Sequence, residues 1–242
     1  MDPIVFVTWK WRPNGYRHTF TSEHVNVLYA SVKRNYKGPF RFLNVTDDPA
    51  GLERGIEAVP LWKDCDGLLN ASGAHLPSCY RRLKLFARNA HELLGVPEGS
   101  IVCSLDLDIV VTGDLTKAMQ KPGDFVGWVR RGTNHPRVFN GSVWKLRLGS
   151  LPHIWENFDP VLSPHAVHRA GYLGSDQSWM SYRLQGQPGF EREDGFLHYG
   201  VDAQGHATLP SDARMVIFCG KKKPWHEDIR RRYAWVREHW RV

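Results

Sequence analysis

Hydrophobic and polar positions along the chain predict strands and helices in alternation. Residues 4–9 and 40–45 are short runs rich in β-branched and aromatic side chains, as expected for buried strands. Between them, apolar side chains recur at helical spacing over residues 22–36, and Gly38-Pro39 ends that pattern. This order of strand, helix and strand predicts an α/β sheet.

The pattern continues with further candidate elements. A loop is expected at 63–77, followed by a helix at 78–94 for which Ser78 is the expected N-cap. Another helix is expected to open at Asp176. Further strands are predicted at residues 55–61, 100–111, 124–130 and 138–146. Because the sequence shows no internal repeat and no linker, the 242 residues are expected to form a single domain.

Two carboxylates stand in the apolar run at residues 100–111. Asp106 and Asp108 are separated by one leucine, and β-branched residues follow them. Buried carboxylates need a partner, and their oxygens suit hard divalent ions such as Mg²⁺ and Mn²⁺. Such ions usually share their coordination with phosphate groups. The pattern therefore predicts a metal site in an enzyme that handles a diphosphate; a solvated turn without function is the alternative.

Polar residues also stand at the ends of other predicted strands. Thr8 to Lys10 end the first strand, and Asp47 and Asp48 follow the second. Because ligands of α/β sheets bind beyond the carboxyl ends of the strands, we expect both groups to converge with Asp106 on one edge.

Three later segments are also candidates for ligand contacts. After a strand-like run, Gly220 precedes three lysines and Pro224, a combination that suits phosphate but also a solvated basic turn. Asp176-Gln177 either contacts a ligand or simply starts a helix. Asn140 lies in a predicted strand, where it either exposes its amide to a ligand or belongs to a bulge.

Composition narrows the range of partners. The formal charge of +7 suits an anionic ligand, an anionic membrane surface or nucleic acid, although no long basic block carries it. The 10 tryptophans fit either stacking on a ligand or a place in the core. Four cysteines without Cys-x-x-Cys spacing predict neither a zinc site nor a disulfide framework. With no signal-peptide pattern and no apolar run of membrane-spanning length, we expect a cytoplasmic protein.

Taken in order, these motifs resemble those of nucleotide-sugar glycosyltransferases of the GT-A fold, most closely the retaining family-eight type and its bacterial and phage relatives. The resemblance covers roughly residues 4–228. The segments that carry it are Val7-Thr8-Trp9-Lys10, Thr46-Asp47-Asp48, Asp106-Leu107-Asp108, Phe139-Asn140-Gly141-Ser142, Asp176-Gln177 and Gly220-Lys221-Lys222-Lys223-Pro224-Trp225. In the fourth segment the Ser-Gly order of the family is reversed.

The resemblance implies a single domain with a Rossmann-like, mixed GT-A sheet flanked by helices. Residues 1–130 would form the nucleotide-binding half, residues 131–228 the half for the donor sugar and the acceptor, and residues 229–242 a C-terminal amphipathic helix. The implied reaction transfers a sugar from a nucleotide-diphosphate sugar, a UDP-sugar first of all, to a saccharide, lipid-linked or protein acceptor. Nucleic acid is not an implied partner. Retention of configuration is implied, although Asp176 could also serve as the base of an inverting reaction.

The resemblance also implies roles for individual residues. A metal ion, Mn²⁺ or Mg²⁺, would be held by Asp106 and Asp108 and would neutralise charge on the leaving diphosphate. Asp176, Gln177 and Asn140 are the candidates at the reacting sugar carbon. The candidate contacts to the nucleotide and donor are Thr8, Trp9, Lys10, Asp47, Asp48, Arg81, Lys84, Asp106, Gly220, Lys221 and Lys223.

One position departs from the family pattern. The final motif of the family carries a His that completes the metal shell, and the corresponding residue here is Ile217 or Cys219, depending on the form of the motif. Isoleucine cannot bind a metal, and cysteine is a softer ligand that favours other metals. Either Cys219 or His226 takes the place of that His, or the metal rests on the two aspartates, the diphosphate and water.

The C-terminal tail places Ile229, Tyr233, Val236 and Trp240 on one face of a helix. That face either docks on the core or lies in a membrane interface, where a basic, aromatic helix would bring the enzyme to lipid-linked acceptors. The second alternative places the protein peripherally at the inner face of the membrane.

Other functions share some of these features. Haloacid-dehalogenase-like phosphatases also carry an Asp-x-Asp motif, here Asp106 and Asp108, but usually near the N-terminus and with the first Asp as nucleophile. A sugar-phosphate nucleotidyltransferase would share the fold. The charge and aromatic content also fit a nucleic-acid-binding protein, although no RNP-like, zinc or helix-turn-helix signature supports it.

Overall fold

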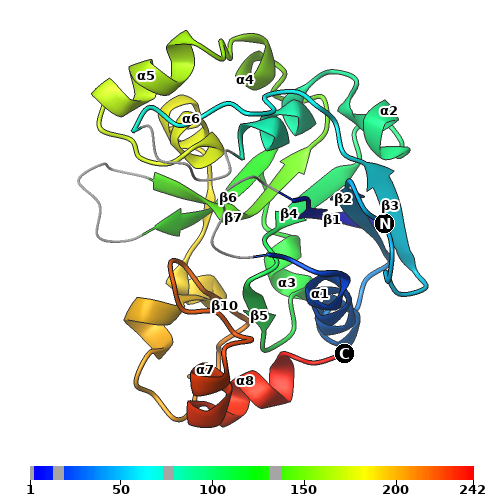
Figure 1. Ribbon diagram of the computed structural model, residues 1–242, viewed down its shortest axis with the longest axis vertical. Helices are drawn as coiled ribbons and strands as arrows, with labels where there is room; N and C mark the ends of the chain where they lie inside the picture. The colour runs from blue at the N-terminus through cyan, green and yellow to red at the C-terminus, as the bar shows by residue number, and fades with distance from the viewer. Residues whose placement is uncertain (1–2, 13–18, 73–78, 131–137) are drawn as a thin grey trace.

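The computed structural model describes residues 3–12, 19–72, 79–130 and 138–242, so the expected N-cap Ser78 lies outside it. A seven-stranded mixed sheet crosses the middle of the molecule, and a small three-stranded sheet lies below it in Figure 1. The strand orders are β3-β2-β1-β4-β7-β6-β8 and β5-β10-β9. The predicted α/β class, with a mixed sheet flanked by helices, is confirmed.

The first half of the chain builds the parallel part of the large sheet. The strands β1 (Ile4–Lys10), β2 (Phe40–Thr46), β3 (Ile56–Pro60) and β4 (Ile101–Leu105) run parallel. Helix α1 (Ser22–Asn35) connects the first two. The strand–helix–strand order predicted from the apolar pattern is therefore confirmed.

The second half of the chain adds to the large sheet one strand of opposite direction. Strand β7 (Val138–Arg147) pairs antiparallel with both β4 and β6 (Phe125–Arg130). A short strand, β8 (Gly189–Phe190), closes the edge parallel to β6. The described strands of the large sheet thus all run in one direction except β7, which lies between β4 and β6.

The predicted strand at 100–111 is in fact two strands in two sheets. After β4 ends, β5 (Ile109–Val111) enters the small sheet, where it pairs with β10 (Met215–Ile217), which in turn lies beside β9 (Phe196–His198). The apolar pattern could not reveal this break because both pieces are buried β-structure. The segment 106–108 therefore spans the gap between the two sheets.

The predicted helix at 78–94 is wrong as a single helix. A 3₁₀-helix, η1 (Tyr80–Phe86), is followed by extended backbone at Ala87 and by the short helix α2 (Ala90–Leu94). Nearly all side chains of η1 are buried, so packing on several sides, rather than one amphipathic face, fixes its geometry. Between η1 and the C-terminal tail, the described chain also forms α3 (Thr116–Met119), α4 (His153–Glu156), α5 (Leu162–Arg169), α6 (Asp176–Arg183), η2 (Arg192–Asp194) and the π-helical turn η3 (Tyr199–Ala203).

Two apolar cores lie on opposite faces of the large sheet, and alternate side chains of β1 enter them. Val7 and Trp9 pack in the core covered by η1, α2, α4 and α6, whereas Phe6 packs beneath α1 and α3. Most of the tryptophans, Trp9 and Trp144 among them, are buried in the cores. Their number therefore reflects packing more than an exposed stacking surface.

The C-terminal tail forms two short helices rather than one. Helices α7 (Glu227–Arg232) and α8 (Ala234–His239) are separated by Tyr233, whose backbone is extended. The side chains predicted to share one face are all buried in a third core, which includes residues of the small sheet: Ile229, Tyr233, Val236 and Trp240. The docking interpretation is confirmed, and the face that a membrane interface would need is already buried.

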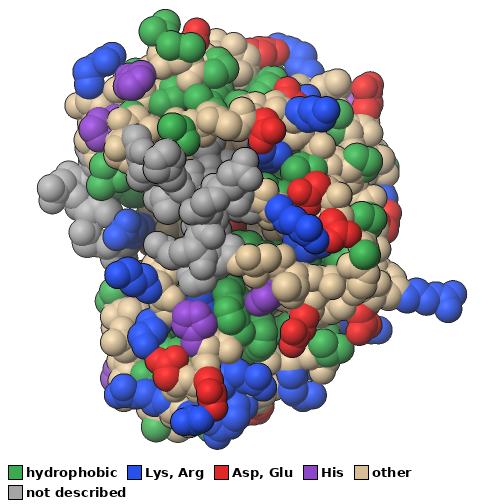
Figure 2. Space-filling view, viewed as in Figure 1, with side chains coloured by type: hydrophobic (Ala, Val, Ile, Leu, Met, Phe, Trp, Pro, Cys, Tyr) green, Lys and Arg blue, Asp and Glu red, His purple; other side chains and the backbone are tan. Residues whose placement is uncertain are grey.

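The outward side of α7 and α8 carries arginines, and basic side chains gather at the lower end of the face in Figure 2. Within the described ranges, no helix is both long enough and apolar enough to cross a membrane.

Truncating an apolar contact of the tail should destabilise the protein with no lipid present. We expect Ile229→Ala, at a position only 2% exposed, to lower the free energy of unfolding by about 2–5 kcal/mol, because it leaves a cavity in the third core. At the exposed neighbouring position, Arg230→Ala should change it by less than about 0.5 kcal/mol. Urea unfolding followed by circular dichroism measures both, and equally small effects would contradict docking of the tail.

Candidate functional site

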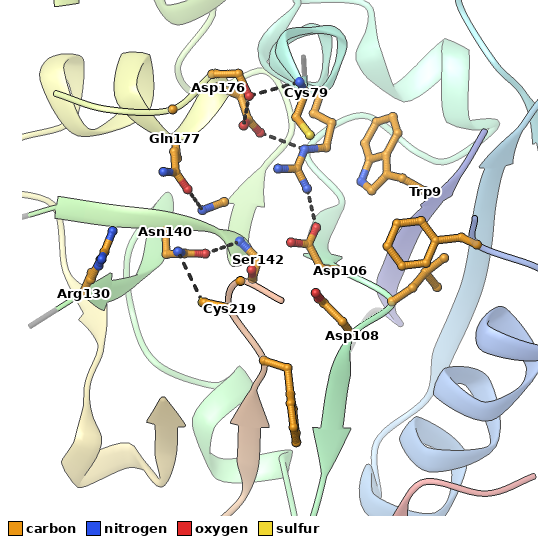
Figure 3. Close-up of a pocket in the computed structure, with 18 of the residues that line it drawn as sticks. Trp9, Cys79, Asp106, Asp108, Arg130, Asn140, Ser142, Asp176, Gln177 and Cys219 are labelled. Carbon is orange, nitrogen blue, oxygen red and sulfur yellow. Dashed lines mark hydrogen bonds and ion pairs between the residues drawn. The ribbon is translucent and has the colours of Figure 1, made fainter. Parts of the chain in front are cut away.

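A cavity of about 580 Å³ opens where the large and small sheets meet (Figure 3). Its walls come from the ends of β1, β4, β9 and β10, from β7 and from the start of α6. Of the site residues predicted from the sequence, those that line it are Trp9, Asp106, Asp108, Asn140, Asp176, Gln177, Cys219, Gly220 and Lys223. Most of the predicted motifs therefore converge on one place.

Backbone hydrogen bonds hold the two aspartates at the gap between the sheets. The Asp106 N–H donates to the Ser142 carbonyl (2.9 Å), which extends the pairing of β4 and β7 by one residue. The Phe218 N–H donates to the Asp108 carbonyl (3.2 Å), which fastens Asp108 to the end of β10. Both carboxylates line the cavity from a backbone that is anchored on two sides (Figure 3).

Asp108 is buried, with 7% of its surface exposed. Its Oδ2 pairs with the Lys223 ammonium, whereas its Oδ1 is buried and has no hydrogen-bond partner within the described part of the chain. Burial raises the pKa of Asp108, and the Lys223 charge opposes that rise. Because an unpaired buried carboxylate oxygen is costly, this atom marks a place for a cation or a donor.

The oxygen atoms around the gap fit a hard divalent ion that takes few ligands from the protein. Arg82 engages Oδ1 of Asp106 at 2.6 Å, which leaves Oδ2 of Asp106, like Oδ1 of Asp108, without a partner among the residues that the structure describes. Among the described residues, no group of three or more His, Cys, Asp and Glu side chains is arranged to hold a metal. Mg²⁺ and Mn²⁺ commonly rest on one or two carboxylates and take the rest of their shell from phosphate and water.

The three candidates for the missing third ligand occupy different environments. Ile217 is fully buried in an apolar core. Cys219 lines the cavity, but burial, then Asp108 and Asp106, raise the pKa of its thiol to about 12, which disfavours the metal-binding thiolate. His226 precedes α7 and does not line the cavity.

Arg82, on η1, joins two of the carboxylates. Its Nη1 donates to Asp106 Oδ1 (2.6 Å) and its Nε donates to Asp176 Oδ2 (2.7 Å), with only 4% of the arginine exposed. Burial raises the pKa of Asp176, and the neighbouring guanidinium opposes that rise. The arginine fits because residue 141 is glycine: a Cβ there would lie 2.6 Å from Nη2 of Arg82.

Arg81 and Lys84, the two cations expected at the donor, do not line the cavity. Arg81 pairs with Asp66 (2.6 Å), and Lys84 pairs with Asp64 (2.5 Å). On the 3₁₀-helix, with three residues per turn, it is Arg82 that points to the aspartates. The apolar pattern predicts an ordinary α-helix at this place. The sequence therefore could not show which of Arg81, Arg82 and Lys84 faces the aspartates.

The other residues expected at the nucleotide divide in a similar way. Trp9 lines the cavity, whereas the hydroxyl of its neighbour Thr8 is buried and donates to a backbone carbonyl of β4 at 3.0 Å. Lys10 donates to the Asp48 carbonyl, so the ends of β1 and β2 are joined beside the cavity. The residues that stand outside its lining are Thr8, Lys10, Asp47, Asp48 and Lys221.

Asn140 lies at the start of a bulge in β7. The ladder opposes Asn140 to Trp128 but Trp144 to Gly127, so the intervening residues have no partner on β6. The Asn140 amide oxygen accepts the Ser142 N–H (2.9 Å), and Asn140 lines the cavity (Figure 3). The two alternatives for Asn140, bulge and ligand-facing amide, are therefore compatible.

The start of α6 supplies a further wall. Asp176 and Gln177 both open the helix and line the cavity, so these two alternatives are also compatible. The Gln177 Oε1 accepts the Gly141 N–H (3.4 Å), and its Nε2 donates to the Leu173 carbonyl (3.1 Å). These bonds orient the amide beside the bulge of β7.

Two basic residues at the ends of short strands were not found from the sequence. His198 ends β9 and stacks on Trp128, with ring centroids 6.0 Å apart. Burial, then the Arg130 charge, lower the pKa of His198, which keeps the ring neutral at pH 7. Both His198 and Arg130 line the cavity. A three-residue strand such as β9 is too short to give a periodic signal.

Comparison with known proteins shows a likeness in fold but not in sequence. No family model matches the chain, and no curated protein matches it. Among solved structures, the galactosyltransferase LgtC in complex with donor and acceptor sugar analogs is 17% identical, with a TM-score of 0.62 over 98% of this chain and 97% of that one. An active-site mutant of LgtC gives the same TM-score at 16% identity.

The glycosyltransferase GlyE of Streptococcus pneumoniae TIGR4 is similar over 94% of this chain but only 57% of its own, with a TM-score of 0.54 and 17% identity. The protein therefore has the α/β fold of GT-A glycosyltransferase structures, in a sequence far from theirs.

Proposed function

We propose that the protein is a metal-dependent glycosyltransferase that moves a sugar from a UDP-sugar to an acceptor, with retention of configuration. The acceptor would be a saccharide, free or carried on a lipid or a protein. The observation that supports this best is Asp108 Oδ1, a buried and unpartnered carboxylate oxygen in a cavity shared with Asp106, Arg82 and Lys223. The fold supports it too, because LgtC, which shares it, was captured with donor and acceptor sugar analogs.

Two buried cations of the chain would act on the donor's diphosphate. Lys223 and Arg82 both line the cavity, and both are almost fully buried. Fixed positive charge in a site that excludes water stabilises the negative charge that develops on a leaving diphosphate. A Mn²⁺ or Mg²⁺ ion on Asp106 and Asp108 would add Lewis-acid chemistry at the same oxygens.

The contacts of Asp176 support retention. Its Oδ2 accepts from Arg82, and its Oδ1 lies 3.3 Å from the Ser175 hydroxyl that donates to it. A carboxylate engaged in this way is poorly placed to take a proton from an acceptor hydroxyl, which an inverting transfer requires. Asp176 would act instead by positioning Arg82, while Gln177 and Asn140 would line the place of the reacting carbon.

Nucleotide binding should stabilise the folded protein in a metal-dependent way. We expect UDP or a UDP-sugar to raise the melting temperature only with Mn²⁺ or Mg²⁺ present. At a ligand concentration 100 times Kd, the free energy of unfolding should rise by about 2.7 kcal/mol. For a chain of this size, each kcal/mol raises the melting temperature by roughly 2–4 °C. A thermal-shift panel of nucleotides and nucleotide sugars, with and without Mn²⁺, measures this.

The panel should include Asp108→Ala and, as a matched control, Asp124→Ala. Asp124 is exposed and pairs with Arg147 at the surface (3.1 Å), outside the cavity lining. The shift should vanish in Asp108→Ala and persist in Asp124→Ala. If no nucleoside diphosphate shifts the unaltered protein, the glycosyltransferase proposal is wrong.

Gly141→Ala should slow the reaction by displacing Arg82. The new Cβ would meet the guanidinium of Arg82 at 2.6 Å, so the arginine must shift away from Asp106 and Asp176. Misplacement by about 1 Å can cost on the order of 10²-fold in rate. We expect such a loss in hydrolysis of the UDP-sugar that stabilises the protein most, together with weaker UDP binding, because Arg82 would act on the diphosphate that UDP carries. Full turnover in Gly141→Ala would show that the position of Arg82 does not matter to the reaction.

A further inference from the structure

We propose that Lys223 is an exchanging counter-ion. In the cavity without nucleotide its ammonium pairs with Asp108, and when metal and nucleotide bind it leaves the carboxylate for the diphosphate. This inference rests on the proposed function and adds to it a reason why metal and nucleotide should bind together.

The ion pair of Lys223 and Asp108 is almost fully buried, as is the pair of Arg82 and Asp176 in the same cavity. The Lys223 ammonium contacts Asp108 Oδ2 and lies 3.4 Å from the Phe218 carbonyl, with 3% of the lysine side chain exposed. Each charge taken alone at this depth would be strongly unfavourable, so the two depend on each other. Asp108 therefore already holds a monovalent cation at the carboxylate that a metal would use.

The other two buried carboxylates are tied to a different cation. Arg82 bridges Asp106 and Asp176, at 2.6 Å and 2.7 Å. These ion pairs hold three carboxylates and two cations, and Arg130, which also lines the cavity, brings the formal charge of the lining to zero. A divalent ion alone would add two positive charges near the Lys223 ammonium, where repulsion is weakly screened. The two negative charges of a sugar-nucleotide diphosphate would offset that ion and offer the ammonium new oxygens.

The lysine has room to make this exchange. Lys223 lines the cavity, so its ammonium can turn from Asp108 toward a ligand without crossing the protein surface. Its four-carbon stem is flexible, and the ammonium needs no planar geometry for its contacts, unlike a guanidinium. Gly220 lies three residues before Lys223 at the cavity wall. Its φ is 86°, and no atom lies within 4 Å of the place where a Cβ would be.

The exchange predicts reciprocal coupling. If the ammonium on Oδ2 of Asp108 disfavours a divalent ion at the free Oδ1 until a diphosphate accepts the ammonium, then nucleotide must raise metal affinity, and metal must raise nucleotide affinity by the same factor. A lysine that only supports the fold would give no such dependence on its own charge.

The test compares Mn²⁺ binding in Lys223→Met and in the unaltered protein, with and without UDP. Electron paramagnetic resonance of free Mn²⁺ gives each affinity without any assay of activity. Without UDP, we expect Lys223→Met to bind Mn²⁺ about 10-fold more tightly than the unaltered protein does, a factor within the usual range of coupling. Adding UDP should then raise the Mn²⁺ affinity of Lys223→Met far less than it raises that of the unaltered protein. The matched control is Lys222→Met, since Lys222 is exposed and pairs with Asp228 (2.5 Å) outside the cavity lining. It should behave like the unaltered protein.

Two further measurements keep the outcome decisive. Lys223→Gln, neutral but polar, should show the same direction if Lys223→Met does not fold. In the unaltered protein, the ¹⁵Nζ resonance of Lys223 should move on addition of UDP with Mg²⁺ but not with Mg²⁺ alone. Mn²⁺ binding that is equal or weaker in a folded Lys223 variant, or a lysine resonance that Mg²⁺ alone displaces, overturns the exchange. Failure of UDP to bind at all would count against the proposed function, whereas the Mn²⁺ comparison without UDP tests the exchange separately.

Discussion

The candidate site depends on a balance of buried charge. Carboxylates from 106–108 and from α6 meet cations from η1 and from the segment after β10, and each would be unfavourable in this cavity without the others. Arg82 serves Asp106 and Asp176 at once, while Lys223 serves Asp108 alone. Removal of either cation leaves an uncompensated carboxylate, so the positions of these four segments relative to one another are constrained by electrostatics as much as by packing.

The fold supplies the rigidity that this balance needs. The chain passes from the large sheet to the small one at 106–108, and backbone hydrogen bonds to Ser142 and Phe218 fix it on both sides. Two apolar cores pack against the two faces of the large sheet. A third core, to which the C-terminal helices contribute, packs against the small sheet. Close packing around Gly141 then admits the guanidinium of Arg82 and little else. The cavity lies where the two sheets part, and its lining combines charged and polar groups with aromatic side chains such as Trp9 and Phe218.

Much of the fold could be predicted from the sequence because its longer elements carry regular apolar patterns. The strands of the first half and α1 follow from such patterns, and so does the opening of α6 at Asp176. The errors have physical causes. At 100–111 a change of sheet leaves the burial pattern intact, and at 78–94 packing on several sides favours a 3₁₀-helix over the α-helix that the apolar spacing suggests.

The same limits apply to the site. Asp106, Asp108, Asp176 and Lys223 stand at the ends of recognisable elements, which is why they could be identified as candidates. Arg82 could not be separated from its basic neighbours on η1, because which of them faces the cavity depends on the helix geometry. His198 could not be found either, because its position depends on β9, which exists only through pairing with β10. Long-range pairing of this kind leaves no local trace in the sequence.

The departure from the family pattern at the third metal ligand is understandable in these terms. Ile217, which corresponds to the usual His in one form of the motif, is buried in the small sheet beside Ile109 of β5 and contributes to an apolar core. With that position used for packing, a metal on Asp106 and Asp108 would have too few protein ligands to bind firmly alone. The chain instead places the ammonium of Lys223 against Asp108, so the carboxylate is neutralised before any ligand arrives. A site built this way would leave metal affinity to the nucleotide, which brings both the missing ligands and the negative charge that releases the lysine.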